Sequence, residues 1–388
     1  MSLKCGEREL LFVAYALKTT NFNWFIANAL CNKFILGILK EVHLAPPFFC
    51  KFGGMEFNKL ITVPSLSDIK KVALLLDGVV KRTPLEYSVP LSDRYGAQIF
   101  LKREDLQTVR SYKIRGAYFK ISNIPESLRS QGIVAASAGN HAQGVAFSCA
   151  KMKIKGNIFM PKSTPIQKLD AVRFFGQDYI RINLVGETYD EAFDASRKYC
   201  ETQNAIYIPP FDDFDIIAGQ ATVTLEIMEQ LGQKLDYLMV PVGGGGLAAG
   251  ASLVLRELSP DTNLVGLEPA GAPSMSESIR ARELIHLNDI DKFVDGASVK
   301  QVGAHNFSIC LDGINQMLTI DKNHLCQTML NLYAMKGMIV EPAGALSVAG
   351  LALIQDQIKN KVVVCIISGG NFDPKRFPEI TKIAQSVY

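Results

Sequence analysis

Residues 237–258 read YLMVPVGGGGLAAGASLVLREL, and this segment decides the fold. Tyr237–Val242 is a short apolar run typical of a buried strand, and a helical pattern runs on toward Leu258. The glycines Gly243–Gly246 between them let backbone amides approach an anion closely, and the helix start adds the positive end of its dipole. The segment predicts a strand, a turn suited to phosphate and a helix; a flexible turn without a ligand is the alternative.

The alternation of strand and helix patterns extends outward from this segment, from about Asp68 to the C-terminus. Each further apolar run is bounded by Gly, Ser or Pro and is followed by polar or glycine-rich residues. These predicted strands are Gln98–Leu101, Ile133–Ala136, Asn157–Met160, Asn263–Leu267 and Val362–Ile367. The pattern predicts an α/β protein with open, mostly parallel sheets, whose ligand site lies in the loops after the strands.

Length and composition set further limits. A chain of 388 residues with 48% hydrophobic content is long enough for two lobes with buried cores. The net charge of +3, without a clustered Lys/Arg stripe, argues against nucleic acid as a partner. The eight cysteines form no CxxC pair, and the five histidines form no HExxH pattern. We therefore expect reduced thiols, a cytoplasmic location and no zinc site.

Residues 1–54 differ from the rest of the chain. Polar residues such as Asn28 and Lys33 interrupt the aromatic-rich stretch Phe22–Leu39, which a membrane helix would hardly tolerate. No cationic start followed by a small-residue cleavage site indicates export. Our hypothesis is that residues 1–54 are an extension outside the catalytic fold, because Met55 opens what resembles an ordinary enzyme N-terminus. A protein that began at Met55 and failed to fold or react would refute it.

Two further segments carry candidate chemistry. Lys113 lies in SYKIRGA, residues 111–117, and its amine can condense with an aldehyde once it is partly desolvated. Residues 137–141, SAGNH, follow the strand Ile133–Ala136 and begin a helix whose free amides suit a carboxylate. Within them, Asn140 can hydrogen-bond a ring hydroxyl. Taken singly, a solvated surface lysine and a simple helix cap are the more frequent outcomes.

A fourth segment, SGGN at residues 368–371, follows the strand Val362–Ile367. The Ser368 hydroxyl there can face a ring nitrogen as a neutral partner. A helix cap with a tight turn is the structural alternative, just as His141 is more often a structural hydrogen-bonder than a catalytic base.

These four elements occur together, in this order, in one family. From about Met55 onward, the chain resembles the fold-type II pyridoxal-phosphate enzymes and, within them, the threonine dehydratases. The resemblance implies a tryptophan synthase β-like fold with two open, mostly parallel α/β/α lobes, and pyridoxal 5'-phosphate (PLP) as the cofactor. It implies a large PLP-binding domain of residues 55–122 and 208–388, and a small domain of residues 123–207.

The resemblance also implies roles for individual residues. The segment around Lys113 is similar to the dehydratase pattern S-x-K-x-R-G-A, which implies that Lys113 joins the cofactor covalently and that Tyr112 packs against its ring. Asn140 matches the asparagine at the ring 3-hydroxyl, and Ser368 matches the residue opposite the pyridine nitrogen. The residues that match the phosphate loop are Gly243, Gly244, Gly245, Gly246 and Leu247. The expected substrate-binding residues are Ser137, Ala138, Gly139, Asn140 and His141.

The implied reaction is elimination of water from L-threonine to give 2-oxobutanoate and ammonia, as the first step of isoleucine biosynthesis, with L-serine as a further candidate substrate. Serine racemase is the nearest alternative. It carries a serine where this chain has Ala138, and alanine cannot protonate the opposite face of the Cα. Ser274 stands where that enzyme has a metal-binding carboxylate, so Glu268 and the Ala272 carbonyl leave at most a monovalent cation site.

Two other classes of protein are weaker alternatives. A non-catalytic metabolite-binding relative is disfavoured because every chemical position is filled. A dinucleotide-dependent dehydrogenase is supported only by Glu268, about twenty residues after the glycines.

Residues 293–300 and 340–345 are similar to the biosynthetic branch of the dehydratases. That branch usually carries a C-terminal regulatory domain, whereas this chain ends at Tyr388, so we expect catalysis insensitive to isoleucine. The expected partners are a small amino-acid substrate and further copies of the chain in a dimer or tetramer, with neither nucleic acid nor membrane.

Overall fold

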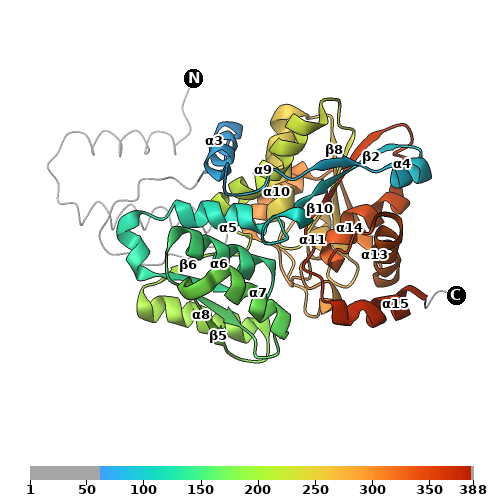
Figure 1. The fold of residues 1–388 in the computed structure, drawn as a ribbon. Helices are drawn as coiled ribbons and strands as arrows, with labels where there is room; N and C mark the ends of the chain where they lie inside the picture. Colours follow the sequence, from blue (N-terminus) through green and yellow to red (C-terminus); the bar gives the residue numbers. More distant parts are fainter. Residues whose placement is uncertain (1–61, 386–388) are drawn as a thin grey trace, which may run out of the picture. The chain divides into compact units, whose positions relative to one another are not determined.

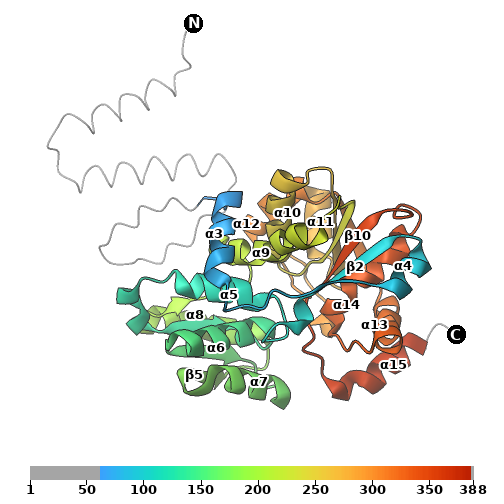
Figure 2. The ribbon, with the colours of Figure 1, turned by 45° about the horizontal axis from the view of Figure 1, so that its top comes forward.

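A computed structural model describes residues 62–385, and the hypothesis about residues 1–54 lies outside this range. The strands form a six-stranded sheet in the order β1-β2-β10-β7-β8-β9 and a four-stranded sheet in the order β5-β4-β3-β6 (Figures 1 and 2). The strands are β1 Leu85–Tyr87, β2 Gln98–Arg103, β3 Ile133–Ala136, β4 Gly156–Met160, β5 Ile180–Leu184, β6 Ile206–Tyr207, β7 Tyr237–Pro241, β8 Asn263–Pro269, β9 Gln316–Ile320 and β10 Val362–Ile367.

Helices follow most of the strands, as expected for an α/β chain. Among residues 62–385, none is long and apolar enough to cross a bilayer. The α-helices are α3 Leu66–Leu76, α4 Val89–Tyr95, α5 Lys113–Ser122, α6 Asn140–Met152, α7 Ile166–Gly176, α8 Tyr189–Gln203, α9 Phe214–Leu231, α10 Gly246–Leu258, α11 Ser274–Ala281, α12 Ala304–Gly313, α13 Lys322–Lys336, α14 Pro342–Ala349 and α15 Phe377–Gln385.

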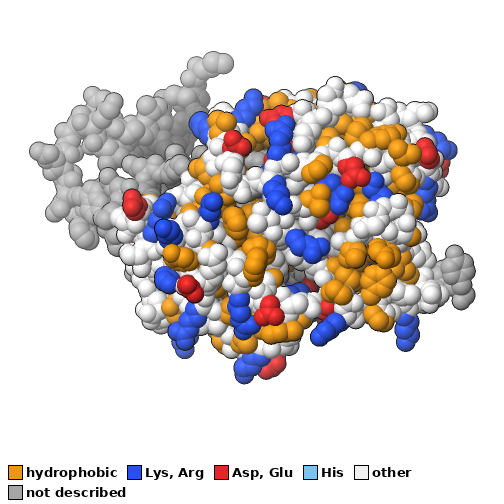
Figure 3. Space-filling model, in the orientation of Figure 1, with side chains coloured by type: hydrophobic (Ala, Val, Ile, Leu, Met, Phe, Trp, Pro, Cys, Tyr) orange, Lys and Arg blue, Asp and Glu red, His pale blue; other side chains and the backbone are white. Residues whose placement is uncertain are grey.

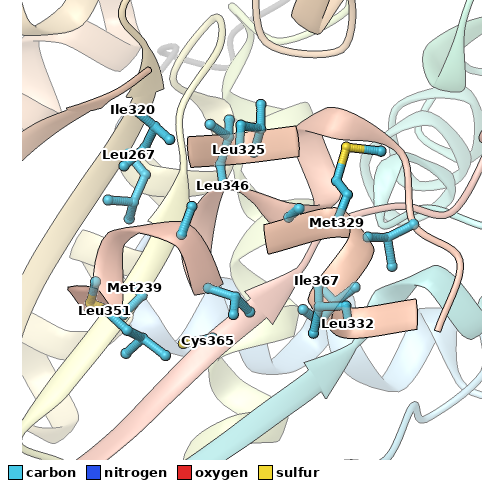
Figure 4. Close-up of a cluster of buried hydrophobic side chains, with 14 of the residues drawn as sticks. Met239, Leu267, Ile320, Leu325, Met329, Leu332, Leu346, Leu351, Cys365 and Ile367 are labelled. Carbon is cyan, nitrogen blue, oxygen red and sulfur yellow. The ribbon is translucent and has the colours of Figure 1, made fainter. Parts of the chain in front are cut away.

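The larger sheet is parallel except for β1, and both of its faces are covered. Val363, Cys365 and Ile367 of β10 lie in a core with α13, α14 and α15 (Figure 4). The alternate residues Val362, Val364 and Ile366 lie in a second core with α9 and α10. Because side chains alternate along a strand and both faces are buried, the strand is a continuous apolar run.

The smaller sheet is wholly parallel and is built in the same way. Ile133 and Ala135 of β3 pack toward α6 and α7, whereas Val134 and Ala136 lie in a cluster with residues of α8. All four strands of this sheet fall within residues 123–207, the interval that the sequence predicts for the small domain.

The six strands predicted from apolar runs are all present, and the four that were missed share one position. β1 and β9 are the edges of the larger sheet, and β5 and β6 are the edges of the smaller one. An edge strand has a neighbour on one side only and is less buried, so its sequence need not be uniformly apolar. The β5 sequence IRINL, for example, has no fully buried residue.

Candidate active site

The segment SYKIRGA is held by close helix packing. Helix α5 begins at Lys113 and crosses α9 where Gly116 meets Gly219: a Cβ on Gly219 would lie 2.5 Å from the Gly116 Cα. On the other side, a Cβ on Gly144 of α6 would lie 3.1 Å from the Lys113 carbonyl oxygen. Glycine is required at these crossings because the neighbouring atoms are backbone and cannot move aside. Lys113 is therefore fixed between α9 and α6.

Arg115 anchors the same segment through buried ion pairs. Its guanidinium is fully buried and donates to Glu104 at 2.8 and 2.9 Å and to Glu226 at 2.7 and 3.0 Å. These carboxylates raise the pKa of Arg115 against the effect of burial, so the charge is kept and fully paired. Arg115 has a structural role, with its side chain paired away from Lys113.

The Lys113 amine is turned toward the site. Its Nζ donates to the Pro210 carbonyl at 2.8 Å and lies 5.4 Å from the centre of the Tyr112 ring. Burial lowers the pKa of Lys113 to about 8, and the nearby Glu341 charge opposes this effect. A sizeable fraction of the amine is therefore neutral slightly above neutral pH, as condensation with an aldehyde requires.

The glycine turn lies at the carboxyl end of β7 and the start of α10. Gly245 has a φ of +94°, which favours glycine. Within residues 62–385, no protein acceptor takes a hydrogen bond from the amides of Gly244, Gly245, Gly246 or Leu247. A turn with free amides at the positive end of a helix is suited to bind an anion.

Phe211 connects this turn to the lysine. A Cβ on Gly244 would overlap the Phe211 ring, and one on Gly246 would lie 3.1 Å from the Phe211 carbonyl oxygen. Phe211 follows Pro210, whose carbonyl accepts from the Lys113 amine. The tertiary structure thus places the amine beside the loop that packs on the glycine turn.

Asn140, the first residue of α6, is held on both sides of its amide. Its Nδ2 donates to Glu341 Oε1 at 2.6 Å, and its Oδ1 accepts from Asn371 Nδ2 at 2.6 Å. These bonds fix which amide atom is nitrogen. Because an amide nitrogen carries two hydrogens, one donor remains for a ligand.

Glu341, just before α14, is a site residue that sequence reasoning noted only as part of a branch motif. Its carboxyl is buried, and burial, followed by the charge of Asp295, raises its pKa to about 7. A Cβ on Gly369 would overlap Glu341 Oε1, so the carboxyl also lies against the loop after β10. The available signal was an acidic residue between apolar runs, in the sequence VEPAGA.

Ser368 and Tyr112 meet at the end of β10. The Tyr112 amide donates to the Ser368 carbonyl at 3.2 Å, and Ser111 pairs with Gly369 in an isolated bridge. The Ser368 hydroxyl is buried and donates to the Ala343 carbonyl at 3.3 Å, a long and weak bond. A hydroxyl held so loosely is free to turn to a better acceptor.

The expected substrate-binding residues form the turn between β3 and α6. Ser137 Oγ accepts from the Gly139 amide at 3.2 Å and so shapes the turn, whereas Ala138 has no polar side-chain atom. His141 Nε2 bonds to the Ile208 carbonyl at 3.0 Å, and burial lowers the pKa of this imidazole to about 3. The ring therefore stays neutral with its proton on Nε2, and only the His141 backbone amide is available to a carboxylate.

Glu268, Ala272 and Ser274 lie at the end of β8 and the start of α11. Both Glu268 oxygens accept hydrogen bonds, from the Met275 amide at 2.7 Å and from the Ser276 amide and hydroxyl at 2.9 and 2.7 Å. Burial raises the Glu268 pKa to about 7. The carboxyl acts as a cap of α11, and the described residues contain no cluster of three His, Cys, Asp or Glu suited to a metal ion. The monovalent cation site stays a prediction.

Taken together, these features fit one kind of cofactor. A lysine amine of lowered pKa, a free amide donor on Asn140 and an anion-binding turn lie at the carboxyl ends of β10, β3 and β7, where parallel sheets bind ligands. They define a class of enzyme that joins a phosphorylated aldehyde to a lysine.

Comparison with known proteins agrees with this class. The family described as pyridoxal-phosphate dependent enzyme matches residues 76–369. The chain belongs to this family and, within it, to the threonine dehydratases. A biosynthetic L-threonine dehydratase of Halalkalibacterium halodurans is 46% identical over 315 residues, which are 81% of this chain and 76% of the relative. The one of Bacillus subtilis is 46% identical over 326 residues, 84% of this chain and 76% of the relative.

Solved structures of related enzymes share the fold of this chain. The processed threonine deaminase isoform 2 of Solanum lycopersicum matches with a TM-score of 0.78 and 36% identity, covering 84% of this chain and 95% of that one. A serine racemase of Dictyostelium discoideum matches with a TM-score of 0.73 and 29% identity, covering 80% and 99%. The predicted α/β fold with two mostly parallel sheets and the predicted cofactor are thereby confirmed, and the dehydrogenase alternative is excluded.

Proposed function

We propose that this chain removes water from L-threonine to give 2-oxobutanoate and ammonia, with Lys113 as the residue that holds PLP and moves the Cα proton. The lowered pKa of Lys113 and its bond to the Pro210 carbonyl carry the proposal. PLP, when bound, supplies the aldehyde that joins amines and the ring that withdraws electrons from the Cα. The biosynthetic relatives support threonine as the substrate and isoleucine biosynthesis as the pathway.

The other predicted site residues have separate tasks in this proposal. The amides of Gly243–Gly246 and Leu247 hold the phosphate, and the second Nδ2 hydrogen of Asn140 is donated to the ring oxygen. Tyr112 packs against the ring. Ser368 offers the ring nitrogen a neutral partner, which leaves the ring a weaker electron acceptor than a carboxylate partner would.

Substrate selection is proposed to occur at the start of α6, where the free backbone amides of Asn140 and His141, next to Gly139, bind the substrate carboxylate. Lys113 serves one face of the Cα. Ala138 offers no acid or base for the other face, so elimination is favoured over racemisation. L-serine fits the same chemistry, and one methyl group discriminates it from threonine by about 1–3 kcal/mol at most.

The test is 2-oxoacid formation from L-threonine and L-serine, with D-serine measured in parallel. In the Lys113→Ala variant we expect turnover to fall by ~10³-fold or more and the visible absorbance of covalently held PLP to vanish. Lys151→Ala, at an exposed lysine of α6, is the matched control. A Lys113→Ala protein with normal turnover would refute the role of Lys113, and abundant D-serine would favour the racemase alternative.

We also propose that residues 55–122 with 208–388 and residues 123–207 act as two lobes of one cytoplasmic enzyme that forms a dimer or tetramer. Figure 3 shows hydrophobic side chains gathered over α13 and α15. There Tyr333 is half exposed, and its ring lies 5.8 Å from the Phe377 ring. Exposed aromatic groups of this kind support self-association, and light scattering of the purified full-length chain tests it.

A further inference from the structure

We propose that Asn306 is a positioning residue that keeps the Gly244–Gly245 peptide turned with its N–H toward the anion side of the glycine turn. The inference rests on the proposed binding of the cofactor phosphate at this turn. Asn306 lies on α12, far from the turn in sequence, and its side chain is fully buried.

The Asn306 amide holds two carbonyl groups at once. Its Nδ2 donates to the Gly244 oxygen at 2.7 Å and to the Phe211 oxygen at 3.2 Å, so both of its hydrogens are used. The Gly303 amide donates to the same Gly244 oxygen at 3.1 Å. The Gly244 carbonyl is therefore held on the α12 side of the turn.

The orientation of this carbonyl fixes the next amide. In a trans peptide, the C=O of Gly244 and the N–H of Gly245 lie in one plane and point in opposite directions. With the oxygen held on the α12 side, the Gly245 N–H faces away from α12. If the peptide turned over, a carbonyl dipole would replace a donor at the phosphate, and glycines on both sides leave little steric resistance to that rotation.

Asn306 also packs against the turn. A Cβ on Gly245 would lie 2.9 Å from the Asn306 Cβ, while Phe211 lies against Gly244. Because Phe211 follows Pro210, which accepts from the Lys113 amine, one side chain joins the turn to the loop that holds the lysine. Asn306 thus sets the position of the turn relative to the amine.

The surroundings of the Asn306 side-chain oxygen indicate that this residue is present for the hydrogen bonds that it donates. Its Oδ1 is buried without a partner in the described part of the chain. An unpartnered buried oxygen destabilises a fold, so an apolar residue would suit this point of α12 better if packing alone were needed. We infer that asparagine is needed at this position for the two hydrogen bonds that its Nδ2 donates.

The experiment titrates the full-length chain, freed of cofactor, with PLP and separately with pyridoxal, which lacks the phosphate. Wild type should prefer PLP. Asn306→Ala should reduce that preference by about tenfold, with little change in pyridoxal affinity, and Asn306→Ser, which keeps one donor, should fall between them. The serine variant carries the test if the alanine variant does not fold.

Asn315→Ala is the control, because it also removes a hydrogen bond between an asparagine side chain and a backbone group, here the one that Asn315 Oδ1 accepts from the Leu264 amide at 2.8 Å, but away from the turn. Its preference for PLP should equal that of wild type. The inference is overturned if the Asn306 variants keep the wild-type preference, or if they weaken PLP and pyridoxal equally. A wild-type protein without any preference for PLP would instead overturn the assignment of the phosphate to the turn, and the inference with it.

Discussion

At the scale of single residues, the site depends on groups whose ordinary behaviour is changed by burial. Lys113, His141 and Glu341 all have a pKa shifted toward the neutral form, because burial disfavours charge. Each is also tied by a hydrogen bond, to Pro210, Ile208 and Asn140 respectively. The site thus keeps a neutral imidazole near neutral pH, and slightly above neutral pH it holds a larger fraction of neutral amine than an exposed lysine would provide.

Because the Glu341 pKa is raised in the fold, we expect the stability of the protein to depend on pH. Its folded pKa of about 7 exceeds the ordinary value of 4.5, so between these pH values the folded chain holds a proton that the unfolded chain has lost. Stability therefore falls as pH rises through this window. Glutamine does not titrate, so the free energy of unfolding of Glu341→Gln should lack this decrease. Relative to wild type, the free energy of unfolding of the variant should therefore rise by roughly 3 kcal/mol between pH 4 and pH 8.

Urea unfolding of the cofactor-free full-length chain at several pH values measures this difference. Glu126→Gln, at an exposed glutamate, is the control and should track wild type throughout. A difference between Glu341→Gln and wild type that does not change with pH would mean that Glu341 is ionised in the fold at an ordinary pKa.

At the scale of elements, the position of the lysine is a consequence of helix packing. The close approach of α5 and α9 at Gly116 and Gly219 and the contact of Gly144 with the Lys113 backbone leave the first turn of α5 no freedom to shift. The buried Arg115 pairs reinforce the same arrangement. Within SYKIRGA, Gly116 allows the close helix contact and Arg115 forms the buried ion pairs, whereas Lys113 has the proposed chemical role.

The helix crossing gives a second stability prediction. Gly219→Ala should destabilise the fold by about 1–3 kcal/mol, although alanine is the better helix former, because its Cβ would meet the Gly116 backbone at 2.5 Å. Turnover should fall as well, since α5 must move and carries Lys113. Gln203→Ala on the exposed face of α8 serves as the comparison, and equal stability of the two variants would contradict the close packing.

At the scale of the whole described unit, contacts join the segment of the smaller sheet to the segments of the larger one. Asn140, after β3 of the smaller sheet, bonds to Glu341 and Asn371 beside the larger sheet. Two ion pairs also link the segments of the two sheets, Lys168 with Asp295 and Lys300 with Asp190 at 3.5 Å. Asp295 also acts on the site at a distance, because its charge contributes to the raised pKa of Glu341.

Asp295→Asn separates these two effects. Loss of a partly exposed ion pair should change stability by less than about 1 kcal/mol. The pH window in which stability falls should nevertheless move downward, because burial still raises the Glu341 pKa but the added contribution of the Asp295 charge is gone. The control is Asp190→Asn, which removes the other of the two ion pairs; an identical pH profile in both variants would show that Asp295 does not act on Glu341.

The sequence alone was sufficient for the central strands, the turn at the four glycines and the family. The strands and the turn depend on local chemistry: uniformly apolar runs for strands buried on both faces, and glycines where backbones must approach closely. The sequence also singled out Lys113, whose role stays a prediction. It did not find the edge strands β1, β5, β6 and β9, whose partial burial leaves no uniform apolar run. It also could not assign Glu341, Asn371, Pro210 and Asn306 to the site. Their contacts join residues up to 231 positions apart, and only the folded chain brings such partners within hydrogen-bonding distance.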